Sequence, residues 1–125
     1  MDEPGRIGLT AEAGTQLEDL LADLNPPQGD GGKVLIKMDI YRLAVANGLK
    51  TGVHPPNLKD KSIPSFRVSE LDENGVFYTA VEKNCSVEQG LPIYNYIERL
   101  AEYGIREFYS SNLRTGELPY DELFS

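Results

Sequence analysis

The apolar positions between residues 36 and 49 follow the repeat of an α-helix. Ile36, Ile40 and Leu43 recur at spacings of four and three. The stripe is widened by Ala44, Val45, Ala46 and Leu49. A stripe of this width is typical of a helix that is covered on most sides. Gly48 fits the left-handed position just beyond a helix end, where a side chain would clash. We therefore expect a buried helix here that organises the domain and stops at Gly48.

An amphipathic helix is also predicted before this one. Its apolar face consists of Leu17, Leu20, Leu21 and Leu24. Thr10 fits the N-cap, and Asn25-Pro26-Pro27 ends the helix because proline lacks a donor and restricts the residue before it. Residues 6–9, which precede this helix, suit a short strand or an extended lead-in.

A long last helix is expected to begin at Pro92, which suits the first turn, and to run to about Tyr109. Its apolar face is formed by Ile93, Tyr96, Ile97, Leu100 and Gly104, with a break allowed at the glycine. The charged positions Glu98, Arg99, Glu102 and Arg106 are expected on its solvent side.

Residues 66–83 permit two interpretations. Asn74-Gly75 is a strong hairpin signal, and Phe66 and Val68 before it with 76–81 after it would form the strands. Alternatively, Asn74-Gly75 separates a short helical turn from a helix over 76–83. The acidic residues Glu70, Asp72 and Glu73 lack the ligand pattern of a calcium loop, so a solvated turn is expected. The fold class predicted is mainly α: a compact bundle of about four helices, with either a short N-terminal strand or a small hairpin near 66–81 as an addition.

At 125 residues, with 40% hydrophobic and 26% charged residues, the chain suits one globular domain over residues 1–125. We expect residues 1–5 to be frayed and the acidic tail, about 110–125, to be loosely ordered. Its apolar residues are Leu118, Tyr120, Leu123 and Phe124. This tail suits a docking segment for a partner or a segment that lies back on its own domain. The chain has no apolar run of membrane-spanning length and no signal-peptide pattern, which predicts a cytoplasmic protein without membrane contact.

Charge divides the chain into three parts. The net charge is −8, and it is distributed as about −6 over residues 1–30, +5 over 31–67 and −7 over 68–125. The candidate contacts for a protein partner or nucleic acid lie in or beside the middle part: Lys33, Lys37, Arg42, Lys50, His54, Lys59, Lys61 and Arg67. Lys37, Arg42 and Lys50 do not share one helix face, so the loop over 51–65 would have to complete a patch.

Candidate chemistry is sparse. Gly29-Asp30-Gly31-Gly32-Lys33 lacks the spacing and the following Ser or Thr of a phosphate-binding loop. His54 has no second histidine or cysteine nearby to complete a metal set. A cysteine nucleophile would require Cys85 to meet His54 in the fold. We therefore expect no enzyme, no catalytic residue, no metal and no cofactor.

The chain resembles the family of DNA phosphorothioation-associated protein 4. The resemblance is carried by Leu17–Leu24, by Gly31-Gly32 and by the run Lys37–Gly52, in which Gly48-Leu49-Lys50-Thr51-Gly52 matches best. Met38 between Lys37 and Asp39 departs from the family's pattern. Asp72 and Gly75 correspond to an aspartate and a glycine that precede a helix in the family, which favours the helical interpretation of 76–83. The resemblance implies a mainly helical accessory protein of a bacterial DNA-modification or phage-defence system, with no catalytic residues to carry over.

Two binding hypotheses follow. In the first, the protein is an accessory or adaptor subunit that contacts another subunit of the same system, or a second copy of itself as a homodimer. In the second, it is a DNA-binding regulator similar to a ribbon-helix-helix dimer, using the basic segment 33–67 and residues 7–9 as the ribbon. The acidic flanks favour the first hypothesis because they would repel a polyanion.

Overall fold

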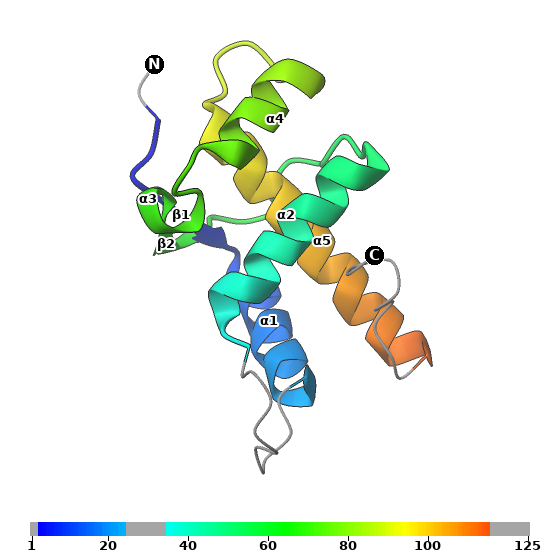
Figure 1. Ribbon diagram of the computed structural model, residues 1–125. Helices are drawn as coiled ribbons and strands as arrows, with labels where there is room; N and C mark the ends of the chain where they lie inside the picture. Colours follow the sequence, from blue (N-terminus) through cyan, green and yellow to red (C-terminus); the bar gives the residue numbers. More distant parts are fainter. Residues whose placement is uncertain (1–2, 25–34, 116–125) are drawn as a thin grey trace.

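The computed structural model describes residues 3–24 and 35–115 of the chain. In chain order its elements are β1 (Arg6–Leu9), α1 (Ala11–Leu24), α2 (Lys37–Thr51), β2 (Ile63–Arg67), α3 (Val68–Leu71), α4 (Val76–Asn84) and α5 (Ile93–Thr115). The predicted mainly helical fold is confirmed. α5 crosses the whole molecule and packs against α2, α1, α4 and β1 (Figure 1). Within the described residues, no helix is both long and apolar enough to cross a membrane.

The helix expected over 36–49 is α2, but it does not stop at Gly48. It continues to Thr51, and the left-handed cap is Gly52, with φ 69°. Gly48 is instead buried within the helix, where an added Cβ would lie 2.9 Å from Leu100 Cδ2. The glycine is therefore explained by the close approach of α2 and α5 and not by a helix end.

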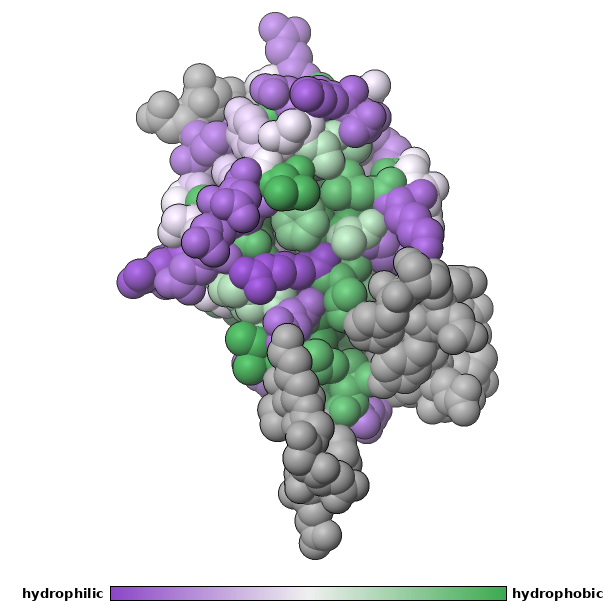
Figure 2. All heavy atoms as spheres, in the orientation of Figure 1, coloured by the Kyte–Doolittle hydropathy of each residue, from purple (hydrophilic) through white to green (hydrophobic). Residues whose placement is uncertain are grey.

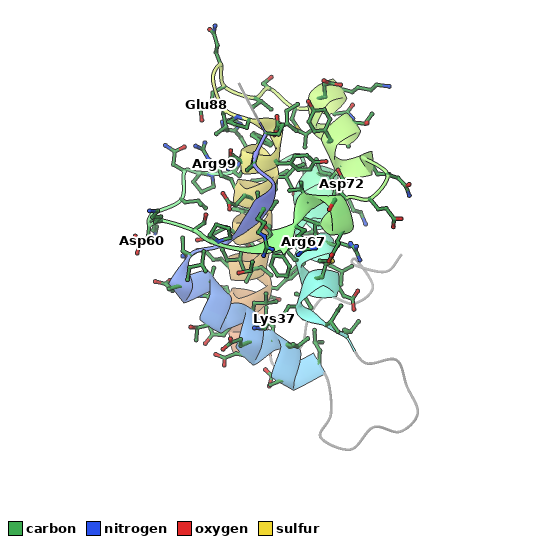
Figure 3. All side chains as sticks on the ribbon, turned by 90° about the vertical axis from the view of Figure 1, so that its left-hand side faces the viewer. Lys37, Asp60, Arg67, Asp72, Glu88 and Arg99 are labelled. Carbon is green, nitrogen blue, oxygen red and sulfur yellow. The ribbon has the colours of Figure 1, made fainter. Side chains whose placement is uncertain are left out.

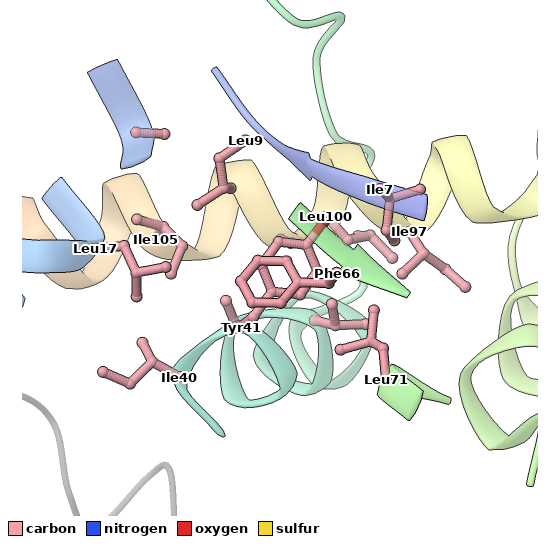
Figure 4. Close-up of a cluster of buried hydrophobic side chains, with 14 of the residues drawn as sticks. Ile7, Leu9, Leu17, Ile40, Tyr41, Phe66, Leu71, Ile97, Leu100 and Ile105 are labelled. Carbon is pink, nitrogen blue, oxygen red and sulfur yellow. The ribbon is translucent and has the colours of Figure 1, made fainter. Parts of the chain in front are cut away.

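The two strands form an antiparallel pair between residues that are far apart in the sequence. Ile7 pairs with Phe66 and Leu9 with Ile63, with an irregularity between Ile7 and Gly8. Phe66 packs against Tyr41 of α2 with ring centroids 4.5 Å apart, in the centre of the core (Figure 4). The N-terminal strand is thus confirmed, whereas the hairpin alternative near 66–81 does not form.

Residues 68–84 adopt the helical alternative, with the short α3 followed by α4. Asp72, expected in a solvated turn, is buried. Its Oδ1 accepts a hydrogen bond from the Phe77 N–H (2.9 Å), and its Oδ2 accepts bonds from the Tyr78 N–H (3.0 Å) and the Tyr94 hydroxyl (3.1 Å). Asp72 therefore caps the start of α4 and joins it to α5.

α5 begins just after Pro92, as predicted, but it runs past Tyr109 to Thr115 without a break at Gly104.

Residues 3–5, expected to be frayed, are fixed by hydrogen bonds. The Glu3 carboxylate accepts bonds from the N–H groups of Ile93 (2.9 Å) and Tyr94 (2.8 Å), and the Gly5 carbonyl accepts one from Val68. The strand β1 is thus held at its beginning by the N-terminus of α5.

Candidate interaction surfaces

The first three basic candidates have different surroundings. Lys33 lies outside the described residues. Lys37 Nζ lies 3.3 Å from Glu18 Oε1 in an exposed ion pair. Arg42 donates hydrogen bonds to the carbonyl oxygens of Leu71 (3.0 Å) and Glu70 (2.6 Å). Arg42 therefore joins α2 to α3, and its guanidinium is used in holding the fold together.

Four more candidates lie at the end of α2, in the loop before β2 and at the end of β2. Lys50 is exposed in the last turn of α2, where its charge complements the helix dipole. Lys59 and Lys61 are exposed in the loop before β2, and Arg67 is exposed at the end of β2. Figure 3 shows Lys37, Asp60 and Arg67 well apart on one side of the molecule. The described basic candidates are thus distributed over two ends of α2, its middle, a loop and a strand, and do not form one continuous row.

The two-stranded sheet places two arginines directly opposite one another. Arg6 of β1 pairs in register with Arg67 of β2, and both are exposed. Like charges at directly opposed positions destabilise a strand pair. Glu70 Oε1 lies 3.8 Å from Arg67 Nη1 and offsets part of this repulsion. The outer end of the sheet is therefore a locally positive site on an acidic protein.

A groove lies between β2 and α1, and we call it the β2–α1 groove. It has a volume of about 460 Å³. The buried side chains of Leu9, Leu17 and Phe66 line its floor. On the α1 side it is lined by the small residues Ala11, Gly14 and Thr15, and on the β2 side by Ile63 and Ser65. Glu18 and Lys37 also line it.

This groove exposes apolar surface, and it lies beside a strand that is paired on one edge. Ile63 is 56% exposed, and an added Cβ at Gly14 would meet nothing within 4 Å. Within the part of the chain that the structure describes, β2 pairs only with β1, so one edge of β2 has no strand beside it. Unpaired strand edges and apolar grooves are both places where an extended segment of another protein binds.

A second hollow, of about 380 Å³, has both His54 and Cys85 in its lining. It is lined by the end of α2, by residues around the end of α4 and by Tyr96 of α5. The His54 and Tyr96 ring centroids lie 6.2 Å apart. Burial, followed by the neighbouring Cys85, raises the pKa of Tyr96. The described lining residues include no carboxylate, so a third group that would orient His54 as a base is not provided there.

Figure 2 shows apolar side chains gathered in the middle of this face, with polar side chains around and between them. Several half-buried apolar side chains of the described helices pack against the core from outside, including Leu43, Leu49 and Phe77. Partly exposed apolar side chains therefore also lie outside the lining of the β2–α1 groove.

Two carboxylates expected on the solvent side of α5 are buried. Glu98 and Glu102 are each only 5% exposed. Glu98 Oε2 accepts a hydrogen bond from the Gly8 N–H (2.8 Å), and Glu102 accepts bonds from the Thr10 N–H (3.0 Å) and hydroxyl (2.8 Å). Burial, then these two carboxylates, raise the pKa of Tyr41 well above its ordinary value. The solvent-side prediction was wrong for both residues because the face they share covers the outer edge of β1.

Arg106, four residues farther on, extends this contact to α1. Its guanidinium lies 3.0 Å from Glu102 Oε2 and 2.6 Å from Glu12 Oε1. The hydrogen bond from Arg106 and its positive charge lower the pKa of Glu12. One signal for this arrangement is present in the sequence: Glu98, Glu102 and Arg106 are spaced by four residues, which places them on one helix face.

Within the described residues, no three His, Cys, Asp or Glu side chains are grouped so that they could hold a metal ion. Compared with protein-family models, curated proteins and solved structures, the chain matches none. The resemblance to the DNA phosphorothioation-associated protein 4 family therefore stays a prediction.

Proposed function

We propose that the protein is a non-enzymatic accessory or adaptor subunit that acts through protein–protein contacts. The observation that carries this proposal is the β2–α1 groove, in which the exposed Ile63 lies beside a floor of buried apolar side chains. Its place in a bacterial DNA-modification or phage-defence system is a further part of the proposal, supported by the sequence resemblance alone.

The charged residues support contact with protein more than with DNA. Arg42 is committed to backbone carbonyls, Lys37 is paired with Glu18, and Arg67 lies near Glu70. A phosphate-binding surface requires several cations that face one polyanion together. Both edges of β1 are also engaged, one by β2 and the other by Glu98 and Glu102. A second copy therefore has no free β1 edge with which to form the ribbon of a ribbon-helix-helix dimer.

The proposal is tested by capture with two matched variants. The immobilised full chain is exposed to an extract of cells that naturally produce it, alongside Ile63→Asp and Val76→Asp. Val76 is 64% exposed and lies on α4, outside the groove lining, so it controls for the loss of an exposed apolar side chain. We expect a partner protein that wild type and Val76→Asp retain and Ile63→Asp loses. Equal retention by all three forms, or no retained protein, would contradict the proposal.

A mobility-shift titration with duplex DNA at low salt tests the alternative. We expect no shift, since phosphate contacts strengthen at low ionic strength and the net charge of −8 opposes them. A shift that Lys59→Ala/Lys61→Ala weakens would favour the DNA-binding function instead.

A further inference from the structure

Arg6 and Arg67 leave the two-stranded sheet as close neighbours, and we call them the arginine pair. The Val68 N–H donates a hydrogen bond to the Gly5 carbonyl oxygen (3.1 Å), immediately beside the point where Arg6 lies opposite Arg67. In an antiparallel ladder this bond makes Arg6 and Arg67 a non-hydrogen-bonded pair, the kind in which opposite side chains lie closest. Their Cβ atoms are therefore about 4.5–5.5 Å apart.

Both arginine side chains point away from the core. The neighbouring residues Ile7 of β1 and Phe66 of β2 are buried, and successive side chains of a strand alternate between its two faces. Arg6 and Arg67 are exposed, as this alternation requires. Two guanidinium groups that start this close together present two planar sets of N–H donors to one small space. Such an arrangement suits an oxyanion that accepts several hydrogen bonds.

Neighbouring groups neutralise the arginine pair only in part. Glu70 Oε1 lies 3.8 Å from Arg67 Nη1, and both side chains are 60% exposed, so their attraction is weak. Among the described residues, no ion pair joins Arg6 to a carboxylate. Arg42 adds a further positive charge here, since its Nη2 donates a hydrogen bond to the Glu70 carbonyl oxygen (2.6 Å).

The other carboxylates of the surrounding elements do not cancel this charge. Three of them accept hydrogen bonds inside the fold: Glu3 at the start of α5, Glu98 at the Gly8 N–H and Asp72 at the start of α4. Glu73 is exposed in the turn after α3. Even with Glu73 counted beside Glu70, three arginines stand against two exposed carboxylates. The local balance is therefore about one positive charge, on a protein whose net charge is −8.

The arginine pair and the β2–α1 groove lie at opposite ends of β2. Ile63 begins the strand and Arg67 ends it, four residues and about 13 Å apart. Lys59, Asp60 and Lys61 precede the Ile63 end, and Figure 3 shows Asp60 well apart from Arg67. A protein that fills the groove can thus also reach the arginine pair, where arginines and not the loop charges determine the contact.

We propose that the arginine pair binds a carboxylate side chain in an acidic segment of the partner protein. Like charges directly opposite one another destabilise a strand pair, and a carboxylate between them offsets this repulsion and accepts charge-assisted hydrogen bonds. The single local positive charge matches one carboxylate, whereas duplex DNA requires a row of cations along several phosphates. This inference rests on the proposed function and adds to it the chemistry that the partner presents.

The test uses nuclear magnetic resonance on the isotope-labelled full chain at low salt, with hexaglutamate as the probe and hexaglutamine as its neutral counterpart. We expect hexaglutamate, and not hexaglutamine, to shift the Nε–Hε signals of Arg6 and Arg67. Arg6→Gln should weaken hexaglutamate binding by about tenfold, the effect of losing a charge-assisted hydrogen bond. Lys83→Gln is the matched control, because it also removes one exposed positive charge but lies in the last turn of α4. It should change the affinity by less than about twofold.

Urea unfolding provides a second measurement on the same variants. Arg6→Gln removes one of the two opposed charges, so its urea midpoint should equal or exceed that of wild type. This result also shows that the weaker binding of the variant does not come from unfolding. A lower midpoint would mean that the two arginines do not repel one another and would contradict the premise of the proposal.

Several binding results would overturn the inference. Absence of a shift at the arginine pair with hexaglutamate would do so, as would equal weakening by Arg6→Gln and Lys83→Gln. Tighter binding of duplex DNA than of hexaglutamate at the same salt would assign the pair to phosphate instead. Failure here is distinguishable from failure of the adaptor function. If the adaptor proposal alone holds, Ile63→Asp still loses the captured partner while hexaglutamate leaves the arginine signals unchanged.

Discussion

Gly104 of α5 sits directly against Ala44 of α2. A Cβ added at Gly104 would lie 2.6 Å from the Ala44 carbonyl oxygen and 2.7 Å from its Cβ. The carbonyl oxygen is part of the helix backbone, and the Ala44 Cβ has no side-chain torsion that could move it away. The two helices would therefore have to separate. The close packing of α2 against α5 therefore requires glycine, which has no side chain, at position 104.

Gly104→Ala is expected to lower the free energy of unfolding by about 1–3 kcal/mol, the usual cost of overpacking a core. Urea unfolding followed by circular dichroism measures it. Gly14→Ala provides the control, because its Cβ would meet nothing within 4 Å. Alanine is a better helix former than glycine, so Gly14→Ala should raise the free energy of unfolding by about 0.8–1 kcal/mol. Similar losses in both variants would contradict the close crossing.

Gly52→Ala should destabilise the protein through the end of α2. Gly52 has φ 69°, a left-handed conformation that costs a residue with a Cβ roughly 1–2 kcal/mol. We expect a loss of about 1 kcal/mol in the free energy of unfolding, and a smaller loss for Gly52→Asn because asparagine tolerates this conformation better. An alanine variant as stable as wild type would show that α2 does not end at this residue.

The positions of Gly48 and Gly52 show what the sequence predicts well and what it does not. The apolar repeat locates the start of α2 to within one residue and its end, expected at Gly48, to within three, because helical burial requires that spacing. It does not distinguish a glycine required for a cap from a glycine required for close packing. That difference depends on Leu100, which is 52 residues away in the sequence.

The same reasoning applies to the candidate surfaces. The lysines and arginines between residues 33 and 67 are recognisable in the sequence as a basic stretch. Whether they form one surface depends on the carbonyl or carboxylate oxygen to which each of them binds in the fold. The groove was not predicted at all, because β1 and β2 are separated by the whole of α1 and α2. Strand pairing at that separation has no local sequence signal.

Glu98→Ala should be clearly destabilising although glutamate is a charged residue on a helix. It removes the acceptor of the buried Gly8 N–H, and an unsatisfied buried donor costs about 1–3 kcal/mol. Glu98→Gln keeps an acceptor oxygen at the same place and should lose less. The two free energies of unfolding are compared in urea at neutral pH. Equal losses for alanine and glutamine would mean that the charge, and not the hydrogen bond to β1, carries the contribution.

Tyr94 should make stability depend on pH in the alkaline range. Burial, then the hydrogen bond to Asp72, raise its pKa to about 12, above the ordinary value of 10.0. The folded state therefore favours the protonated phenol, so the contribution of Tyr94 to the free energy of unfolding is fully present below pH 10 and is lost as the pH rises from 10 to about 12.

The test compares the urea concentrations at which wild type and Tyr94→Phe are half unfolded, from pH 8 upward. The difference between the two isolates Tyr94 because the other tyrosines are common to both. We expect wild type to be the more stable form below pH 10 and its advantage to shrink across that interval. An advantage that stays constant to pH 12 would show that the phenol does not titrate with a raised pKa and that its bond to Asp72 is not formed.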